Sequence, residues 1–162
     1  MKSVMISIHP KWCELIANGK KTIEVRKTRP NCNLPFKCFI YETKDSGGSG
    51  KVIGEFICDK YDLFGDMDSV GVGYFINGHF HYVDTFEAAG FILSKSQLSR
   101  RDLILYRKGH KNIYGWHISN LKIYDKPKEL SDFIHPVSWG YEELKRPPQS
   151  WCYAELWVYP HL

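Results

Sequence analysis

The residues best suited to chemistry in this sequence are three closely spaced charged side chains, Lys21, Glu24 and Arg26. Glu24 and Arg26 are two residues apart, so on a β-strand they share one face. Arg offers a planar fork of donors to a phosphate or a base edge, Lys offers a point charge, and a carboxylate can act as a general base. Lys21 and Glu24 are therefore the candidate catalytic residues, in a site that we expect to bind an anion or a polar base. The alternative is a solvated surface pair of small energetic value.

The other candidate ligand-binding residues are basic neighbours of this segment and polar or aromatic residues at two later strands: Lys20, Arg29, Trp116, His117, Ser150 and Trp151. Trp116 and His117 are adjacent, so they point to opposite faces of a strand, and one of them is expected to face the cleft. Ser150 and Trp151 follow a Pro-Pro turn at a strand entrance, which suits a pocket rim. A base stacked on one of these rings contributes about 1–3 kcal/mol.

No metal or cofactor site is predicted. His79 and His81 share a strand face, and His9 and Cys13 are four residues apart, but neither pair has a third ligand at a clear spacing. The five cysteines are an odd number without a CxxC pair, which indicates free thiols in a reducing, cytoplasmic compartment. The N-terminal region has no long apolar segment, so neither a signal peptide nor a transmembrane helix is predicted, and no membrane partner is expected.

Charge is distributed unevenly along the 162 residues. Residues 11–37 contain seven Lys and Arg against two Glu, and residues 95–111 contain six against one Asp, although the net charge of the chain is only +4. If the two basic segments share a face, they form an electrostatic footprint for phosphates. The alternative is ordinary solvated surface. Aromatic residues make up 15% of the chain, which favours some rings at a binding surface.

Short strands and two helices must position these residues. Apolar spacing and turn signals predict strands over residues 4–8, 21–27, 36–41, 51–58, 113–124 and 151–159. One helix begins at Pro10 and ends at Asn18-Gly19, with Trp12 on its apolar face and therefore in the core. A second helix is predicted over residues 100–108, after a capping box of Ser99 and Asp102.

These elements predict a single α+β, mainly β domain over residues 1–162. Five or six strands with two helices favour a small, mostly antiparallel β-barrel with flanking helices, and an α+β sandwich is the alternative. Residues 62–92 have no firm period and are expected to be an insertion that forms a lid or a lateral element. Residues 127–148 are interrupted by prolines, with one helical turn near residues 130–133.

Gly19, Lys21, Glu24 and Arg26 match the pattern G-x-K-x-x-E-x-R, and at this signature the chain resembles the ASCH domain family of the PUA-like superfamily. Further segments resemble a phage- and prophage-borne branch of that family, namely residues 7–12, 114–119 with 122–127, and 146–153. The similarity covers most of the chain apart from about 62–92. It implies a PUA-like β-barrel with a cleft and an association with RNA or modified nucleosides.

One related branch hydrolyses acetylated cytidine nucleosides with a Lys, a Thr three residues later and a downstream Glu. The resemblance places Lys21 at the Lys position, but Glu24 stands at the Thr position, so the matching nucleophile is absent. Thr22 would have to replace it from a different position. By strand position, either Glu55 or Glu155 could be the downstream Glu.

Other ASCH relatives are reported as ribonucleases, for which His9, His117, Lys21 and Arg26 could supply a base and cations. Because Glu24 replaces the Thr, the sequence favours binding over catalysis. We therefore expect a domain that binds RNA or a nucleotide-like ligand in a cationic cleft. The alternatives are a hydrolase acting on modified nucleosides or RNA, and a phage-type accessory module that binds a host protein without a nucleic-acid role.

Overall fold

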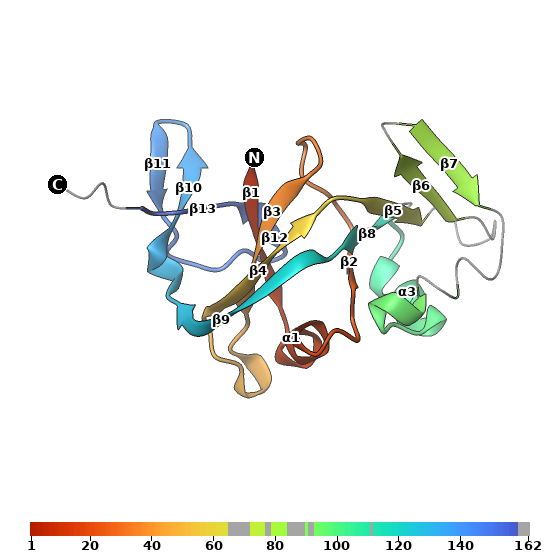
Figure 1. Ribbon diagram of the computed structural model, residues 1–162, viewed down its shortest axis with the longest axis horizontal. Helices are drawn as coiled ribbons and strands as arrows, with labels where there is room; N and C mark the ends of the chain where they lie inside the picture. Colours follow the sequence, from red (N-terminus) through yellow and green to blue (C-terminus); the bar gives the residue numbers. More distant parts are fainter. Residues whose placement is uncertain (65–71, 77–78, 84–89, 91–92, 111, 159–162) are drawn as a thin grey trace.

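The computed structural model describes residues 1–64, 72–76, 79–83, 90, 93–110 and 112–158. In this part of the chain, helices α1 (Pro10–Ala17) and α3 (Arg100–Arg107) accompany three β-sheets (Figure 1). Single 3-10 turns are present at η1 (Asp45–Gly47) and at η2 (Leu130–Asp132), and η2 is the helical turn expected near residues 130–133. None of the helices described is both long and apolar enough to span a membrane.

The central sheet holds most of the core and has the order β12-β1-β3-β4-β9. Its strands are β1 (Ser3–Ile8), β3 (Phe36–Glu42), β4 (Val52–Cys58), β9 (Ser119–Lys128) and β12 (Trp151–Tyr153). β1 and β3 are parallel, and the other pairs in this sheet are antiparallel. Parallel neighbours require a long crossover connection. Residues 9–35 provide this connection, which contains α1 and the charged residues Lys21, Glu24 and Arg26.

A second sheet has the order β2-β8-β5-β6-β7. Its strands are β2 (Ile23–Arg26), β5 (Tyr61–Phe64), β6 (Val72–Ile76), β7 (His79–Val83) and β8 (Ile113–His117). The predicted insertion over 62–92 therefore supplies strands that extend this sheet sideways, away from the central sheet (Figure 1). The remainder of that segment, apart from residue 90, lies outside the described residues.

A small third sheet near the C-terminus has the order β11-β10-β13 and was not predicted. Its strands are β10 (Phe133–Val137), β11 (Gly140–Glu143) and β13 (Glu155–Leu156). Proline disfavours a central strand because it has no N–H to donate. Pro136 fits in β10 because β13 pairs only with Phe133 and Ile134, so one side of Pro136 has no partner strand among the described residues.

The α+β, mainly β class is confirmed, but the sheets are not closed into a barrel. The predicted strand over 113–124 explains the difference, because it divides at Ile118 into β8 and β9. β8 pairs with β2 and β5, whereas β9 pairs with β4, so this stretch connects two open sheets. The predicted last strand divides in the same way at Ala154, with β12 in the central sheet and β13 in the third.

The turn after α1 brings the charged segment into the second sheet. Gly19 has a φ of +78°, a left-handed conformation that glycine adopts without steric cost, and it ends the helix as predicted. The Lys21 N–H then donates to the carbonyl of Leu15 at 2.9 Å, which holds the start of β2 against the helix. At α3, the predicted capping box between Ser99 and Asp102 is present.

Candidate functional site

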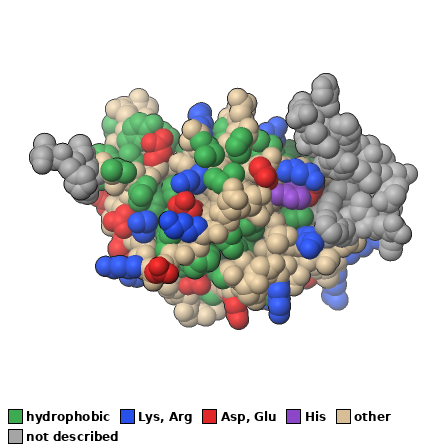
Figure 2. Space-filling view, viewed as in Figure 1, with side chains coloured by type: hydrophobic (Ala, Val, Ile, Leu, Met, Phe, Trp, Pro, Cys, Tyr) green, Lys and Arg blue, Asp and Glu red, His purple; other side chains and the backbone are tan. Residues whose placement is uncertain are grey.

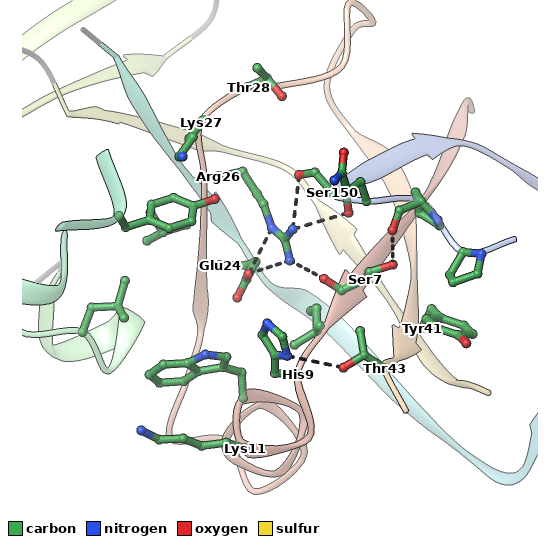
Figure 3. Close-up of a pocket in the computed structure, with 18 of the residues that line it drawn as sticks. Ser7, His9, Lys11, Glu24, Arg26, Lys27, Thr28, Tyr41, Thr43 and Ser150 are labelled. Atoms are coloured by element: carbon green, nitrogen blue, oxygen red, sulfur yellow. Dashed lines mark hydrogen bonds and ion pairs between the residues drawn. The ribbon is translucent and has the colours of Figure 1, made fainter. Parts of the chain in front are cut away.

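Lys21, Glu24 and Arg26 line one pocket of about 980 Å³, and because they are its buried charged residues we call them the pocket floor. Figure 3 shows Glu24 and Arg26 among the residues of this pocket. The floor is bounded by α1, by α3, by the end of β3 and by the segment before β12. The pocket is also lined by residues of these regions, of β1 and β2 and of the stretches next to them: Ser7, Ile8, His9, Lys11, Trp12, Val25, Lys27, Thr28, Tyr41, Thr43, Lys44, Leu98, Asp102, Tyr106, His110, Pro147, Pro148, Gln149 and Ser150.

The floor residues are buried in spite of their charge. Lys21 is 2% exposed, Glu24 6% and Arg26 9%. β2 pairs with β8 along one edge, and residues of α1 and of the 147–150 segment line the pocket beside its charged face. The solvated surface pair weighed from the sequence is therefore wrong for these residues. Buried charges persist only when they are paired and hydrogen-bonded, so their contacts decide their role.

Arg26 uses all of its donors within the protein. Its Nε and Nη2 lie 3.1 Å from Oε1 of Glu24. Nη1 donates to the hydroxyl and the carbonyl of Ser150, at 3.2 and 3.4 Å, and Nη2 donates to the carbonyl of Ser7 at 2.6 Å (Figure 3). A guanidinium has five N–H donors. Arg26 thus connects β2 to β1 and to the segment before β12, and it keeps no donor for a ligand.

Lys21 is also occupied. Its Nζ donates to the carbonyl of Ser96 at 2.8 Å, lies 3.2 Å from Oε2 of Glu24, and stands 5.0 Å from the centroid of the Trp12 ring. The ammonium has three donors and three neighbours. The floor is therefore a buried network of two cations and one carboxylate, and its role is structural.

Four basic side chains lie higher in the pocket, and we call them the pocket rim: His9, Lys11, Lys27 and Lys44. Lys11 and Lys44 are exposed, and Lys27 is half-buried. The Nζ of Lys11 stands 4.7 Å from the Trp12 ring centroid, which keeps this cation beside the aromatic wall. The Nζ of Lys27 stands 4.9 Å from the ring of Tyr106 on α3.

His9 is held at the rim by polar neighbours from the stretch that follows β3. Its Nδ1 contacts the carboxylate of Asp45 and lies 3.4 Å from the hydroxyl of Thr43 (Figure 3 shows the second contact). Hydrogen bonds from Thr43 and from His9 lower the pKa of the Asp45 carboxyl below its ordinary value. The ring of His9 is thereby oriented at the pocket mouth, although the pair is largely exposed.

Of the other predicted ligand contacts, Ser150 lies in the pocket, whereas Lys20, Arg29, Trp116, His117 and Trp151 do not line it. Trp116 is fully buried and packs edge-on against Phe36, with the ring centroids 5.4 Å apart. Trp151 packs against Trp116, and its Nε1 donates to the hydroxyl of Thr28 at 2.9 Å. The expectation that Trp116 or Trp151 lines the cleft is therefore not met, because β8 and β12 direct these rings into or along the core.

The expected basic and imidazole contacts are directed elsewhere. Arg29 covers the rings of Tyr61 and Tyr114, with its Cζ 5.6 and 5.8 Å from their centroids. Lys20 is exposed beside the end of α1. The Nε2 of His117 lies 2.5 Å from Oδ2 of the buried Asp62, outside the pocket. Since β8 and β2 are antiparallel with His117 opposite Ile23, the imidazole cannot share the floor.

Sequence reasoning placed Trp12 in the core, but its ring is only partly buried and forms a wall of the pocket. The charged neighbour Lys11 indicated that this part of the helix meets solvent as well as the core. The second basic segment also behaves differently from the prediction, because α3 contributes Asp102 and Tyr106 to the pocket, whereas Arg101 does not line it. On the face seen in Figure 2, Lys and Arg side chains alternate with Asp and Glu instead of forming one basic patch.

The hydrolytic set implied by the resemblance is not assembled here. Thr22 does not line the pocket, and its N–H donates to the carbonyl of Lys95 at 2.8 Å. Glu55 accepts a 2.5 Å hydrogen bond from Tyr124 on the central sheet, and Glu155 is exposed on β13. Neither carboxylate reaches the floor.

Among the side chains that the structure describes, no three or more His, Cys, Asp or Glu are grouped so that they could hold a metal ion. The side chains of His79 and His81 are outside the described set.

A family model for the ASCH domain matches residues 6–128, which include β1, α1, the whole floor and β9. The chain belongs to the ASCH domain family. Comparison with curated protein sequences gave no match. The family is generally related to nucleic acids, with RNA-binding or hydrolase-like domains, and the match therefore agrees with the class of function expected from the signature.

Solved structures of an ASCH protein from Zymomonas mobilis share the fold. One has a TM-score of 0.56 and 21% identity, with 94% of this chain and 87% of that chain covered. A single-substitution variant of that protein has a TM-score of 0.57 and 20% identity, with 94% and 90% covered. This ASCH protein thus keeps the family fold over nearly its whole length, including elements beyond residue 128.

Proposed function

We propose that this ASCH domain binds RNA or a nucleotide-like ligand in the pocket above Lys21, Glu24 and Arg26. The observation that carries the proposal is the composition of the lining, in which five Lys and Arg face two carboxylates beside the rings of Trp12 and Tyr106. Cations in a cleft attract phosphates, and flat rings can stack on bases. A pocket of about 980 Å³ is large enough for a nucleotide.

The cations divide into two groups with different roles in this proposal. The donors of Lys21 and Arg26 are used inside the protein, so these residues contribute a positive field but no direct contact. Lys11, Lys27 and Lys44 lie nearer to solvent and supply the phosphate contacts. Affinity should therefore fall as salt rises, because each contact releases condensed counterions.

The test is binding of fluorescent single-stranded RNA and of nucleotides to the wild type and to a triple variant, Lys11→Ala with Lys27→Ala and Lys44→Ala. A matched control removes three exposed cations outside the pocket, with Lys20→Ala, Arg101→Ala and Lys126→Ala. We expect the first variant to lose affinity at least tenfold more than the control. Equal losses would contradict the pocket as the binding site, and absence of binding by the wild type would reject the function.

A hydrolase acting on modified nucleosides or RNA is a second proposal, supported by His9. This imidazole lies at the pocket mouth with its Nδ1 against Asp45, an arrangement that orients the other ring nitrogen as a general base. Turnover of acylated cytidine or of RNA, abolished by His9→Ala but kept in Lys20→Ala, would support it. No turnover of either substrate by wild-type protein that binds RNA would leave binding alone.

We also propose a cytoplasmic location, in keeping with five cysteines that are all free thiols in the structure. Cell fractionation tests this point. Recovery of the protein from an oxidising compartment with its cysteines cross-linked would contradict it.

A further inference from the structure

A pair of aromatic rings adjoins the pocket at Thr28. Thr28 lines the pocket, and in Figure 3 it lies at the opposite end of the site from Lys11. Its hydroxyl accepts a 2.9 Å hydrogen bond from Nε1 of Trp151, whose ring centroid is 5.7 Å from that of Tyr153. Both aromatic residues belong to β12, an edge strand of the central sheet, and they pack against the core while remaining half-buried. The wall of the pocket therefore continues outward into a short aromatic surface.

Two cations accompany this aromatic surface. The Nζ of Lys2 lies 5.5 Å from the centroid of the Tyr153 ring. Arg29, which directly follows Thr28, lies over two further tyrosine rings, with its Cζ 5.6 and 5.8 Å from their centroids. The charges of Lys2 and Arg29 both act on the thiol of Cys32, where they oppose the rise in its pKa that burial causes. The two cations therefore lie near the same residue, on the side of the pocket where Thr28 stands.

Both of these cations are exposed to solvent. Among the residues that the structure describes, no carboxylate forms an ion pair with Lys2 or Arg29. The floor cations Lys21 and Arg26, in contrast, are both paired with Glu24. An exposed cation beside a ring keeps N–H donors that a phosphate can accept. Cations of this kind next to flat rings are the combination that binds the backbone and the bases of a single-stranded nucleic acid.

We propose that the pocket holds one nucleotide of a single-stranded RNA and that the rest of the RNA leaves the pocket past Thr28. The RNA then crosses the rings of Trp151 and Tyr153, and its phosphates contact Arg29 and Lys2. We call these five residues the outer track. This inference rests on the proposed function and narrows its ligand from a free nucleotide to an oligonucleotide. The occupant is argued from the two unpaired positive charges and from the direct connection between Thr28 and Trp151.

The length of the ligand tests the outer track on the native protein. 5′-Phosphorylated oligomers of uridine and of adenosine, with one, two and four nucleotides, are titrated by calorimetry. A site for a single nucleotide gains at most about fourfold between the monomer and the tetramer, because the tetramer only offers more registers for the same contacts. We expect the gain to be at least tenfold, because contacts on the outer track add to those in the pocket.

Variants connect this gain to the outer track. Lys2→Ala with Arg29→Ala should weaken binding of the tetramer at least tenfold and leave the affinity for the monomer unchanged. Lys122→Ala with Lys126→Ala is the matched control, because it removes two exposed cations outside the pocket, of which Lys122 also lies over a tyrosine ring. The control should leave both affinities unchanged. The length series on wild-type protein still decides the question if the double variant of the track does not fold.

Two sets of results separate this inference from the function on which it rests. A gain below tenfold from monomer to tetramer would overturn the outer track while leaving nucleotide binding in place. The same conclusion follows if the track variant and the control bind the tetramer equally well. No binding of any nucleotide or RNA would overturn the proposed function and the inference together.

Discussion

The pocket floor and the pocket rim contain cations in opposite situations. On the floor, Lys21 and Arg26 are buried and their donors are used by the protein, whereas Lys11, Lys27 and Lys44 at the rim lie nearer to solvent. Lys11 and Lys27 stand beside aromatic rings, and Lys11 also interacts electrostatically with Asp102. The same residue types therefore serve stability at one depth and binding at another. A charged motif in a sequence does not by itself tell which of the two it serves.

The largest expected effect comes from removing the carboxylate that joins the two floor cations. Glu24→Ala leaves Lys21 and Arg26 buried without their anion, and loss of one partner of a buried pair costs about 3–5 kcal/mol. Urea denaturation should show this loss in the free energy of unfolding, with Glu14→Ala on the surface of α1 as the control. A change below about 1 kcal/mol, within the range of many surface substitutions, would mean that the floor is not a structural network.

The next effect concerns the geometry of the guanidinium. Arg26→Lys keeps the charge but loses the fork that reaches both Ser7 and Ser150, so it should cost about 2–3 kcal/mol, as for other hydrogen bonds lost from charged groups. Hydrogen exchange at the amide of Ser7, which donates to the Ser150 carbonyl at 3.0 Å, should accelerate. Wild-type protection at that amide in the variant would show that Arg26 does not join the two segments.

The aromatic wall should contribute to affinity. Trp12→Ala removes a ring that lines the pocket beside Lys11, and loss of base stacking weakens binding by about 1–3 kcal/mol. Trp139→Ala, at a residue that is 78% exposed and does not line the pocket, is the control. RNA affinity measured by fluorescence anisotropy distinguishes the two. Equal affinities would exclude stacking on Trp12.

Rim substitutions should hardly change stability. Lys11→Ala and Lys44→Ala remove exposed side chains, and each should change the free energy of unfolding by less than about 0.5 kcal/mol. Urea denaturation of each variant measures it. A loss of 2 kcal/mol or more, on the order of a buried hydrogen bond to a charged group, would erase the distinction between floor and rim.

The smallest effect is a shift in titration at the rim. The hydrogen bond from Thr43, with a further one from His9, lowers the pKa of Asp45 below the ordinary 3.8, so its stabilising contribution is present above that value and is lost as pH falls through the lowered pKa. Thr43→Val should raise the pKa of Asp45 toward its ordinary value, as followed by NMR titration of the carboxyl carbon. An unchanged pKa would show that Thr43 does not hold the rim.

Local signals were enough to predict some elements of this domain. The glycine stop of α1, the Ser99–Asp102 capping box and the assembly of Lys21 with Glu24 depend on residues close in sequence. The partners of Arg26 do not, because two of them are backbone carbonyls, 19 and 124 residues away. Backbone acceptors have no sequence signature. The sequence therefore could not show that Arg26 holds two segments together and does not contact a ligand.

The open sheets and the aromatic placements were missed for a related reason. The apolar pattern of residues 113–124 is the same whether one strand closes a barrel or two strands join separate sheets, and only pairing with β4 or with β2 decides. Adjacent strand residues point in opposite directions, but the pattern does not show which side is the cleft. As a result, Trp116, which was predicted as a ligand contact, is in the core, and Trp12, which was predicted in the core, lines the pocket.

The most direct test of the division between floor and rim is the salt dependence of RNA binding. The logarithm of affinity should fall with the logarithm of salt concentration, and the slope should become shallower by about 0.7 for each phosphate contact removed from a single strand. The triple rim variant should therefore lose about two units of slope, whereas Arg26→Lys should keep the wild-type slope. An unchanged slope in the triple variant, or a shallower one in Arg26→Lys, would contradict the account.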